Sequence, residues 1–176
     1  MQTITFQTDL GAMAVAYHGK KVFSLAFGHA SEKAALIAVQ DRCTECPSTD
    51  DNLDEQELEL DEMIDRLQAF AAGEVTDFSD IQIDDSYGTI FQRRVLQACR
   101  AIPWGETRTY GQLAESAGRP GAARAVGSVM AGNRVPLLVP CHRVVPATGG
   151  LGGFSAPQGV TMKRRLLKLE KAQVSF

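Results

Sequence analysis

The sequence predicts two domains of different class, an α/β domain over residues 1–84 and a mainly helical domain over residues 85–176. Charge divides the chain at the same place. Residues 1–84 contain 17 Asp or Glu and 5 Lys or Arg, whereas residues 85–176 contain 4 acidic and 13 basic residues. Apolar residues form short β-like runs near the N-terminus and recur at helical spacing in the second half. A chain of 176 residues is long enough for two small domains.

The first domain is expected to hold a small antiparallel sheet with helices. Residues 3–8, 12–18 and 21–27 read as strands, and Gly19-Lys20 predicts a hairpin between the last two. A helical pattern then runs from Ser31 to about Gln40.

The rest of this domain is expected to be a polar loop followed by one long acidic helix. The loop covers residues 43–52 and contains Pro47. Apolar residues then follow an approximately helical period from Leu53 to Phe70, and Gly73 is expected to end the helix.

Cys43 and Cys46 have the spacing of a zinc or redox motif, but a structural zinc site needs four ligands. His18 and His29 are the only other candidates in this half, and neither forms a ligand pair with a further Cys or His. We therefore expect no metal and no cofactor, and two thiols in a loop.

The compartment is expected to be reducing, because the four cysteines show no disulfide-framework spacing. The first residues have neither a basic nor an apolar secretion-signal region, and no run approaches the length of a membrane span. We expect a cytoplasmic protein, or a nuclear one in a eukaryote, without a membrane partner.

The second domain is expected to be helical with short turns. A helix over Thr89–Ile102 ends before Pro103, and Pro103-Trp104-Gly105-Glu106 forms a turn. Thr109 can cap a helix running from Tyr110 to about Ala117.

A second short helix and a final basic helix complete this domain. Gly118-Arg119-Pro120-Gly121 breaks the chain before a helix over Ala122–Ala131. Two short helices joined by a tight glycine-containing turn predict a helix-turn-helix unit. The final helix is expected over Thr161–Lys171, and the excess of cations in this half favours a nucleic-acid partner over mere attraction between the two halves.

The helix over residues 122–131 has an unusual composition for a DNA reader, with Arg124 alone among small residues. Such a helix can approach DNA closely through Ala123, Ala125, Gly127 and Ser128, which suits the minor groove. Arg124 could then fill the space left by a flipped nucleotide. The alternative is that the small residues serve helix packing, with Arg124 at the surface.

Cys141 is the candidate nucleophile, since His142 and Arg143 follow it directly. Thiolate is the reactive form of cysteine, and a neighbouring base or positive charge raises its population near pH 7. The alternative is a small apolar residue at the end of a core strand, because adjacent side chains on a strand point to opposite faces.

The stretch from Phe91 to Glu170 resembles the C-terminal domain of the O6-alkylguanine-DNA alkyltransferases. The matching segments are Thr109-Tyr110 with Leu113-Ala114, Ala122-Ala123-Arg124-Ala125-Val126-Gly127, Gly132-Asn133, Val139-Pro140-Cys141-His142-Arg143-Val144-Val145, and Leu166-Leu167 with Glu170. The first half fits more loosely, as the variable RNase H-like α/β domain of that family.

The resemblance implies direct reversal of DNA damage by single-turnover transfer. Cys141 would take the alkyl group from a flipped O6-alkylguanine and keep it, with O4-alkylthymine as a second candidate substrate. His142 would act as the base through a water, Glu170 would orient the imidazole, and Tyr110 would donate towards the guanine ring. We expect a monomer on double-stranded DNA, with cooperative binding of several copies left open.

The resemblance also assigns the pocket that holds the flipped base. Its residues would be Met130, Asn133, Val144, Phe154 and Ser155, where Asn133 braces the turn before the active site and the carbonyls of Cys141 and Val144 face guanine. One segment departs from the family pattern, since Ala156-Pro157 stands where relatives have two glycines. We expect a stiffer and smaller pocket that is less tolerant of bulky O6 substituents such as benzyl.

Three other readings compete with this one. A non-catalytic relative that binds alkylated DNA and recruits other repair factors would carry Trp or Ala in place of Cys141. A form that regulates transcription after self-methylation would need a further zinc domain. A cysteine hydrolase would turn over, whereas the alkyltransferase is consumed.

Overall fold

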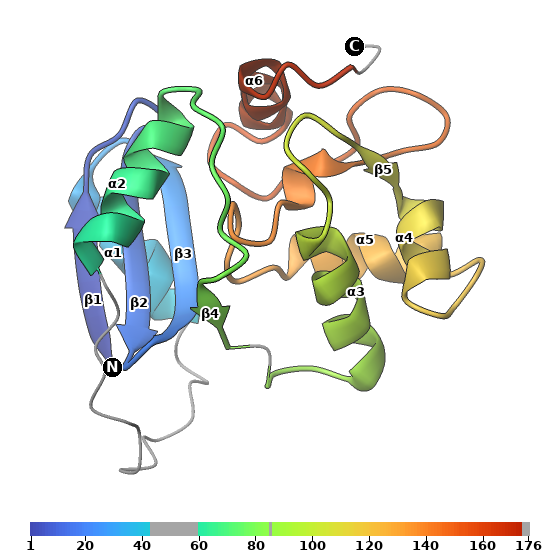
Figure 1. Ribbon diagram of the computed structural model, residues 1–176, viewed down its shortest axis with the longest axis horizontal. Coiled ribbons are helices and arrows are strands. Elements are labelled where there is room, and N and C mark those ends of the chain that lie inside the picture. The colour runs from blue at the N-terminus through green and yellow to red at the C-terminus, as the bar shows by residue number, and fades with distance from the viewer. Residues whose placement is uncertain (43–59, 85, 174–176) are drawn as a thin grey trace. The chain divides into compact units, whose positions relative to one another are not determined.

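The computed structural model describes residues 1–42, 60–84 and 86–173 (Figure 1). The chain divides into two compact units, Met1–Asp84 and Asp85–Phe176. In the part of the chain that is described, no helix is both long and apolar enough to cross a bilayer.

A four-stranded sheet is the centre of the first unit (Figure 1). Strands β1 (Gln2–Phe6), β2 (Ala12–His18) and β3 (Lys21–His29) pair antiparallel in chain order. Strand β4 (Gln82–Ile83) pairs in parallel with β3. The expectation of a purely antiparallel sheet is therefore wrong at this edge, because the chain returns to the sheet through a crossover with a helix, which is what parallel pairing requires.

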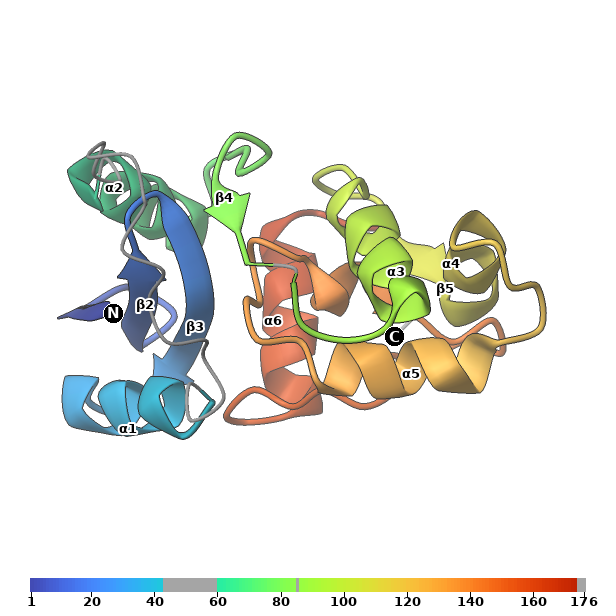
Figure 2. The same ribbon diagram turned by 90° about the horizontal axis from the view of Figure 1, so that it is seen from below.

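Two helices flank this sheet on opposite faces, as Figure 2 shows: α1 (Glu32–Arg42) and α2 (Leu60–Ala71). Helix α1 packs closely because the contact consists of small side chains, namely Ala12, Ala14, Ala16, Ala26, Ala35 and Val39. The predicted start of the acidic helix at Leu53 lies outside the described residues. Gly73 follows α2 with φ of 92°, as expected of a helix-ending glycine.

The second unit begins with three helices, α3 (Ile90–Arg100), α4 (Tyr110–Ser116) and α5 (Ala123–Ala131). Helix α3 contacts both α4 and α5 (Figure 2). Thr109 caps α4 as predicted: its side chain accepts from the Gln112 N–H, and the Gln112 side chain accepts from the Thr109 N–H. The turn between α4 and α5 uses Gly118 and Gly121 at φ of 79° and 80°.

The remaining elements lie near the candidate nucleophile. The 3-10 helix η1 (Cys141–Arg143) leads into β6 (Val144–Val145), which pairs in parallel with β5 (Arg108–Thr109). Cys141 thus lies in a helical turn and does not end a core strand. The final helix α6 spans Val160–Leu169, so it begins one residue earlier and ends two residues earlier than predicted.

Candidate active site

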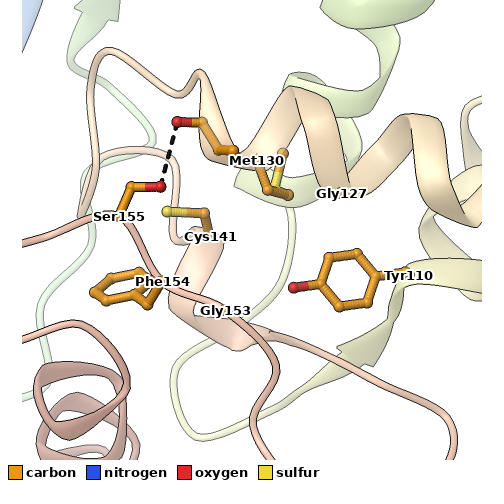
Figure 3. A pocket seen from close by; sticks show the side chains of 8 residues that line it. Tyr110, Gly127, Met130, Cys141, Gly153, Phe154 and Ser155 are labelled. Carbon is orange, nitrogen blue, oxygen red and sulfur yellow. Dashed lines mark hydrogen bonds between the residues drawn. The ribbon is translucent and has the colours of Figure 1, made fainter.

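A cavity of about 280 Å³ opens beside Cys141 in the second unit. Its wall is formed by Tyr110, Gly127, Met130, Ala131, Cys141, Gly153, Phe154 and Ser155. In Figure 3 the Cys141 sulfur and the Tyr110 hydroxyl both point into this space from different elements. Ser155 Oγ donates to the Ala131 carbonyl at 3.4 Å, which ties the pocket loop to the end of α5 (Figure 3).

The loop before Cys141 is held in one shape by the Asn133 side chain. Asn133 Nδ2 donates to the Val139 carbonyl at 2.8 Å, and Asn133 Oδ1 accepts from the Val135 N–H at 3.1 Å. Val139 N–H also donates to the Val135 carbonyl at 2.9 Å, and Leu137 within this turn has φ of 73°. Left-handed backbone at a leucine is unfavourable, so the surrounding hydrogen bonds and burial must hold it there.

His142 and Glu170 form a buried pair behind the nucleophile. His142 is fully buried and Glu170 is 2% exposed. His142 Nε2 and Glu170 Oε1 lie 2.8 Å apart. Glu170 is the C-cap residue directly after α6, so the end of that helix positions the carboxylate.

Arg143 completes the ionic contacts of Glu170. Its Nε donates to Glu170 Oε2 and its Nη2 donates to Glu170 Oε1, each at 2.9 Å, while Nη1 donates to the Ile102 carbonyl. The guanidinium therefore binds both oxygens of the carboxylate and shares Oε1 with the imidazole.

Protonation follows from this arrangement. Burial lowers the pKa of His142, and the opposing effect of Glu170 does not restore it. Burial also acts to raise the pKa of Glu170, but hydrogen bonds and charges from His142 and Arg143 outweigh burial and lower it to about 2. At neutral pH the imidazole is neutral and the carboxylate is charged. His142 Nε2–H then donates to Glu170, which leaves Nδ1 as the basic nitrogen.

Lys163 is a buried cation of the site that the sequence analysis did not identify. Its Nζ donates to the Val144 carbonyl at 2.6 Å and lies 6.0 Å from the centre of the Tyr110 ring. Burial lowers its pKa to about 8, although charges on Cys141 and Cys99 act in the opposite direction. One signal could have found it: Lys163 shares a helix face with Leu166, Leu167 and Glu170, at spacings of i+3, i+4 and i+7.

Tyr110 is the first residue of α4 and lines the cavity with its phenol. Burial raises its pKa, and the nearby Cys141 and Cys99 raise it further, so the hydroxyl keeps its proton at neutral pH. A Cβ atom added at Gly152 would lie 3.3 Å from the Tyr110 hydroxyl oxygen. An added Cβ atom there would be in tight contact with the phenol, and the φ of 69° at Gly152 also favours glycine.

Helix α5 connects an exposed surface to the cavity. Arg124, Ala125 and Ser128 are exposed and Ala123 and Gly127 are partly buried, whereas Met130 and Ala131 at the other end line the pocket.

Five residues were predicted to form the pocket, and three of them, Met130, Phe154 and Ser155, do so. Asn133 and Val144 are buried outside the cavity wall. The Val144 carbonyl accepts from Lys163, and the Cys141 carbonyl accepts from the Val144 N–H. Asn133 thus braces the loop before Cys141, and neither Asn133 nor Val144 contributes to the cavity wall in the described residues.

Among the described residues, the cysteines other than Cys141 form no metal site. Cys43 and Cys46 lie outside the described residues. Cys99 is a fully buried free thiol, and burial raises its pKa well above the ordinary value, so it stays protonated. Among residues 1–42, 60–84 and 86–173, no group of three or more His, Cys, Asp or Glu side chains could hold a metal ion.

Comparison with known proteins places this site in a family. Residues 90–172 match the model of the DNA-binding domain of 6-O-methylguanine DNA methyltransferase. The chain is 49% identical over 110 residues to a methylated-DNA–protein-cysteine methyltransferase of Mycobacterium tuberculosis. The aligned region covers 62% of this chain and 64% of that relative. The corresponding protein of Mycobacterium leprae is 50% identical over 113 residues, covering 64% and 66%. The aligned part thus spans just under two thirds of these curated relatives.

The fold comparison extends over nearly the whole chain. The structure of Mycobacterium tuberculosis OGT in complex with DNA superimposes with a TM-score of 0.72 at 35% identity, covering 96% of this chain and 92% of that one. The structure of the O6-methylguanine methyltransferase from the same organism gives a TM-score of 0.71 at 34% identity, covering 97% and 93%. With a matching domain model around Cys141 and a common fold over both units, the chain belongs to the O6-methylguanine-DNA methyltransferase family.

Proposed function

We propose that this protein repairs alkylated DNA by moving the alkyl group of O6-alkylguanine onto Cys141, once per molecule. The observation that carries the proposal is the position of Cys141 in the wall of a cavity, directly before the buried His142–Glu170 pair. A thiol of this kind is a suitable nucleophile for an alkyl carbon. The methyltransferase names of the relatives support the same reaction.

The proposed reaction moves one proton before the alkyl group moves. The Cys141 proton passes through a water to Nδ1 of neutral His142, and Glu170 stabilises the imidazolium that results. The Cys141 sulfur then attacks the alkyl carbon. A carbon–sulfur bond forms while the bond from that carbon to O6 breaks, and the electron pair of the broken bond leaves with guanine.

Tyr110 is proposed to assist the leaving group. Its hydroxyl points into the cavity and keeps its proton at neutral pH, so it can donate to the guanine ring as negative charge develops there. The guanine anion that results takes up one proton, supplied by the His142 imidazolium through water, and so stays in the DNA in its ordinary form. The thioether on Cys141 is not reversed.

We infer that α4, the turn and α5 act as a helix-turn-helix that enters the minor groove. Helix α5 presents the exposed Arg124, Ala125 and Ser128 beside the partly buried small residues Ala123 and Gly127, so the helix can come close to DNA. Arg124 would take the place of the extruded nucleotide, which then enters the cavity at the other end of α5. The DNA complex of the Mycobacterium tuberculosis relative supports a DNA partner.

The two units are proposed to have separate roles. The unit from residue 85 carries every residue of the proposed chemistry, while the first unit is an α/β scaffold of the RNase H-like kind. The substrate would be double-stranded DNA, bound by a monomer. A reduced Cys141 is needed, which suits the cytoplasm, or the nucleus of a eukaryote.

A non-catalytic lesion-binding protein is the alternative of a different class. The thiol at Cys141 and the buried pair behind it disfavour that alternative, since binding alone requires neither.

Mass spectrometry of the protein after incubation with DNA containing O6-methylguanine tests the proposal. We expect one added methyl group, located on Cys141 by peptide mapping, and none in the Cys141→Ser variant. Cys99 is the internal control, because a buried protonated thiol should remain unmodified. Unmodified Cys141 in the wild-type protein would contradict the proposal.

A further inference from the structure

Two arginines near the turn between α4 and α5 have no acidic partner among the residues that the structure describes. Arg94 on α3 and Arg119 in the turn are both exposed. Within the described residues, neither guanidinium makes a hydrogen bond or an ion pair. Arg66 and Arg108 differ in this respect, since Arg66 binds Asp80 at 2.8 Å and Arg108 binds Glu106 at 2.9 Å.

The two guanidinium groups are placed at one junction of the fold. Arg119 Cζ lies 5.0 Å from the centre of the Phe91 ring, in the first turn of α3. Arg94 Nη1 lies 3.6 Å from the position that a Cβ atom would take at Gly118, the residue before Arg119. Both charges therefore lie where α3 meets the α4–α5 turn, and Figure 2 shows these three helices side by side.

Stacking orients Arg119 without neutralising it. A cation above an aromatic face is held by the ring quadrupole, and its N–H donors at the edge stay available. Two neighbouring positive charges repel each other, so an anion between or beside them would relieve an unfavourable interaction. Guanidinium groups also match phosphate oxygens with paired hydrogen bonds.

The position of Arg94 and Arg119 beside α5 suggests that the anion is a DNA phosphate. Arg119 precedes Arg124 by five residues, and Arg124 projects from the first turn of the helix proposed to enter DNA. A duplex that receives α5 presents its phosphates beside that first turn, and phosphate contacts fix orientation without reading sequence.

We propose that Arg94 and Arg119 form a clamp for the DNA backbone next to the point where α5 enters the groove. The inference rests on the proposed function, and it assigns these two residues to holding the duplex in register while Arg124 acts on the base. Phe91 is a positioning residue, because it touches Arg119 and orients its guanidinium.

The test measures binding of unmodified duplex DNA over a series of salt concentrations. Arg94→Gln and Arg119→Gln should each weaken binding and reduce the slope of log K against log salt by about 0.9, the value for one lost phosphate contact on B-DNA. The double variant should lose about twice that slope. Arg119→Lys should keep most of the slope, and Phe91→Leu should weaken binding while leaving the charge in place.

Lys33→Gln is the matched control for net charge, since Lys33 is exposed on the first unit and has no role in the proposed site. Its slope should equal that of the wild type. The clamp is refuted if the double variant keeps the wild-type slope, or if Lys33→Gln reduces the slope equally. Failure of Cys141 methylation in the wild type would instead overturn the proposed function, because binding of unmodified DNA does not depend on that chemistry.

Discussion

Arg143 binds Glu170 through two parallel hydrogen bonds of 2.9 Å, from Nε to Oε2 and from Nη2 to Oε1. Both side chains are buried. The place of Arg143 in the sequence suggests a positive charge beside Cys141, but its guanidinium binds the Glu170 carboxylate. Its contribution to the site is thus to keep Glu170 ionised and in place.

Removing Arg143 should destabilise the protein strongly. Arg143→Met would leave the Glu170 carboxylate buried without its cation, and we expect the free energy of unfolding to fall by about 3–5 kcal/mol. Arg108→Met is the control, since its ion pair with Glu106 is exposed and should contribute about 0.2–1 kcal/mol. Denaturant titration of both variants measures the difference, and equal losses would contradict the assignment.

Stability should decline as the solution is acidified. Glu170 has a pKa of about 2 in the fold against 4.5 ordinarily, so its stabilising effect is complete above about pH 4.5 and is lost as pH falls towards 2. His142 also makes the fold less stable as pH falls, and its effect begins at a higher pH than that of Glu170. The pKa of His142 is lowered in the fold, so the unfolded chain takes up this proton at a pH where the folded chain does not. Denaturant titrations between pH 8 and 3 should show both losses of stability. The Glu170→Gln variant should lack the loss that occurs at the lower pH.

Lys163 should favour the reactive form of Cys141 through its charge. Lys163→Met should slow alkylation of Cys141 by iodoacetamide at pH 7 on the order of tenfold, because a buried cation near the sulfur is lost. The difference should narrow above about pH 8, where Lys163 itself loses its proton. Peptide mapping separates Cys141 from Cys99, and a constant difference across this pH range would argue against a charge effect.

The pocket loop should limit the size of the alkyl group. Phe154 and Ser155 line the cavity, and Ala156-Pro157 follows them in a turn closed by a hydrogen bond from Gly159 N–H to the Ala156 carbonyl at 2.9 Å. Replacing both Ala156 and Pro157 by Gly should make the loop more flexible and speed inactivation by O6-benzylguanine. Methyl transfer from DNA is the control and should change less. Equal inactivation of variant and wild type would show that this loop does not set the limit.

Arg124 should affect the rate of methyl transfer only when the target base must be flipped out of a duplex. Arg124→Ala should slow methyl transfer from a duplex on the order of 10- to 100-fold, since flipping costs a few kcal/mol. On single-stranded DNA with the same lesion the loss should be smaller. Arg108→Ala, another exposed arginine, should leave both rates near the wild-type values. A similar loss on the two substrates would mean that Arg124 contributes affinity and not flipping.

Local signals predicted the elements that have a strong sequence pattern of their own. Thr109 was recognised as a cap because a hydroxyl residue precedes a helical run, and the α4–α5 turn was recognised from its glycines and proline. Cys141 was proposed from its neighbours in the sequence, but the pairing of His142 with Glu170 came from family resemblance, since 28 residues separate the two. No periodicity reveals a contact of that length.

The missed features depend on tertiary contact. Strands β4, β5 and β6 have two residues each, too few to show alternation, and they exist because a neighbouring strand offers hydrogen bonds. Burial of Lys163 likewise depends on the Val144 carbonyl at the end of the active-site turn. The excess of basic residues in this half favoured a nucleic-acid partner, but the fold buries two of those cations, Lys163 and Arg143.

The capping box at Thr109 has a consequence for how the cavity can vary. Tyr110 is the residue immediately after the cap, so the start of its side chain is set by a backbone locked through Thr109 and Gln112. The cap fixes where the Tyr110 side chain leaves the main chain, on a segment separate from residues 153–157. Substitutions along residues 153–157 can therefore enlarge or narrow the pocket without moving the point from which the tyrosine extends, so the range of accepted lesions can evolve separately from the proposed chemistry.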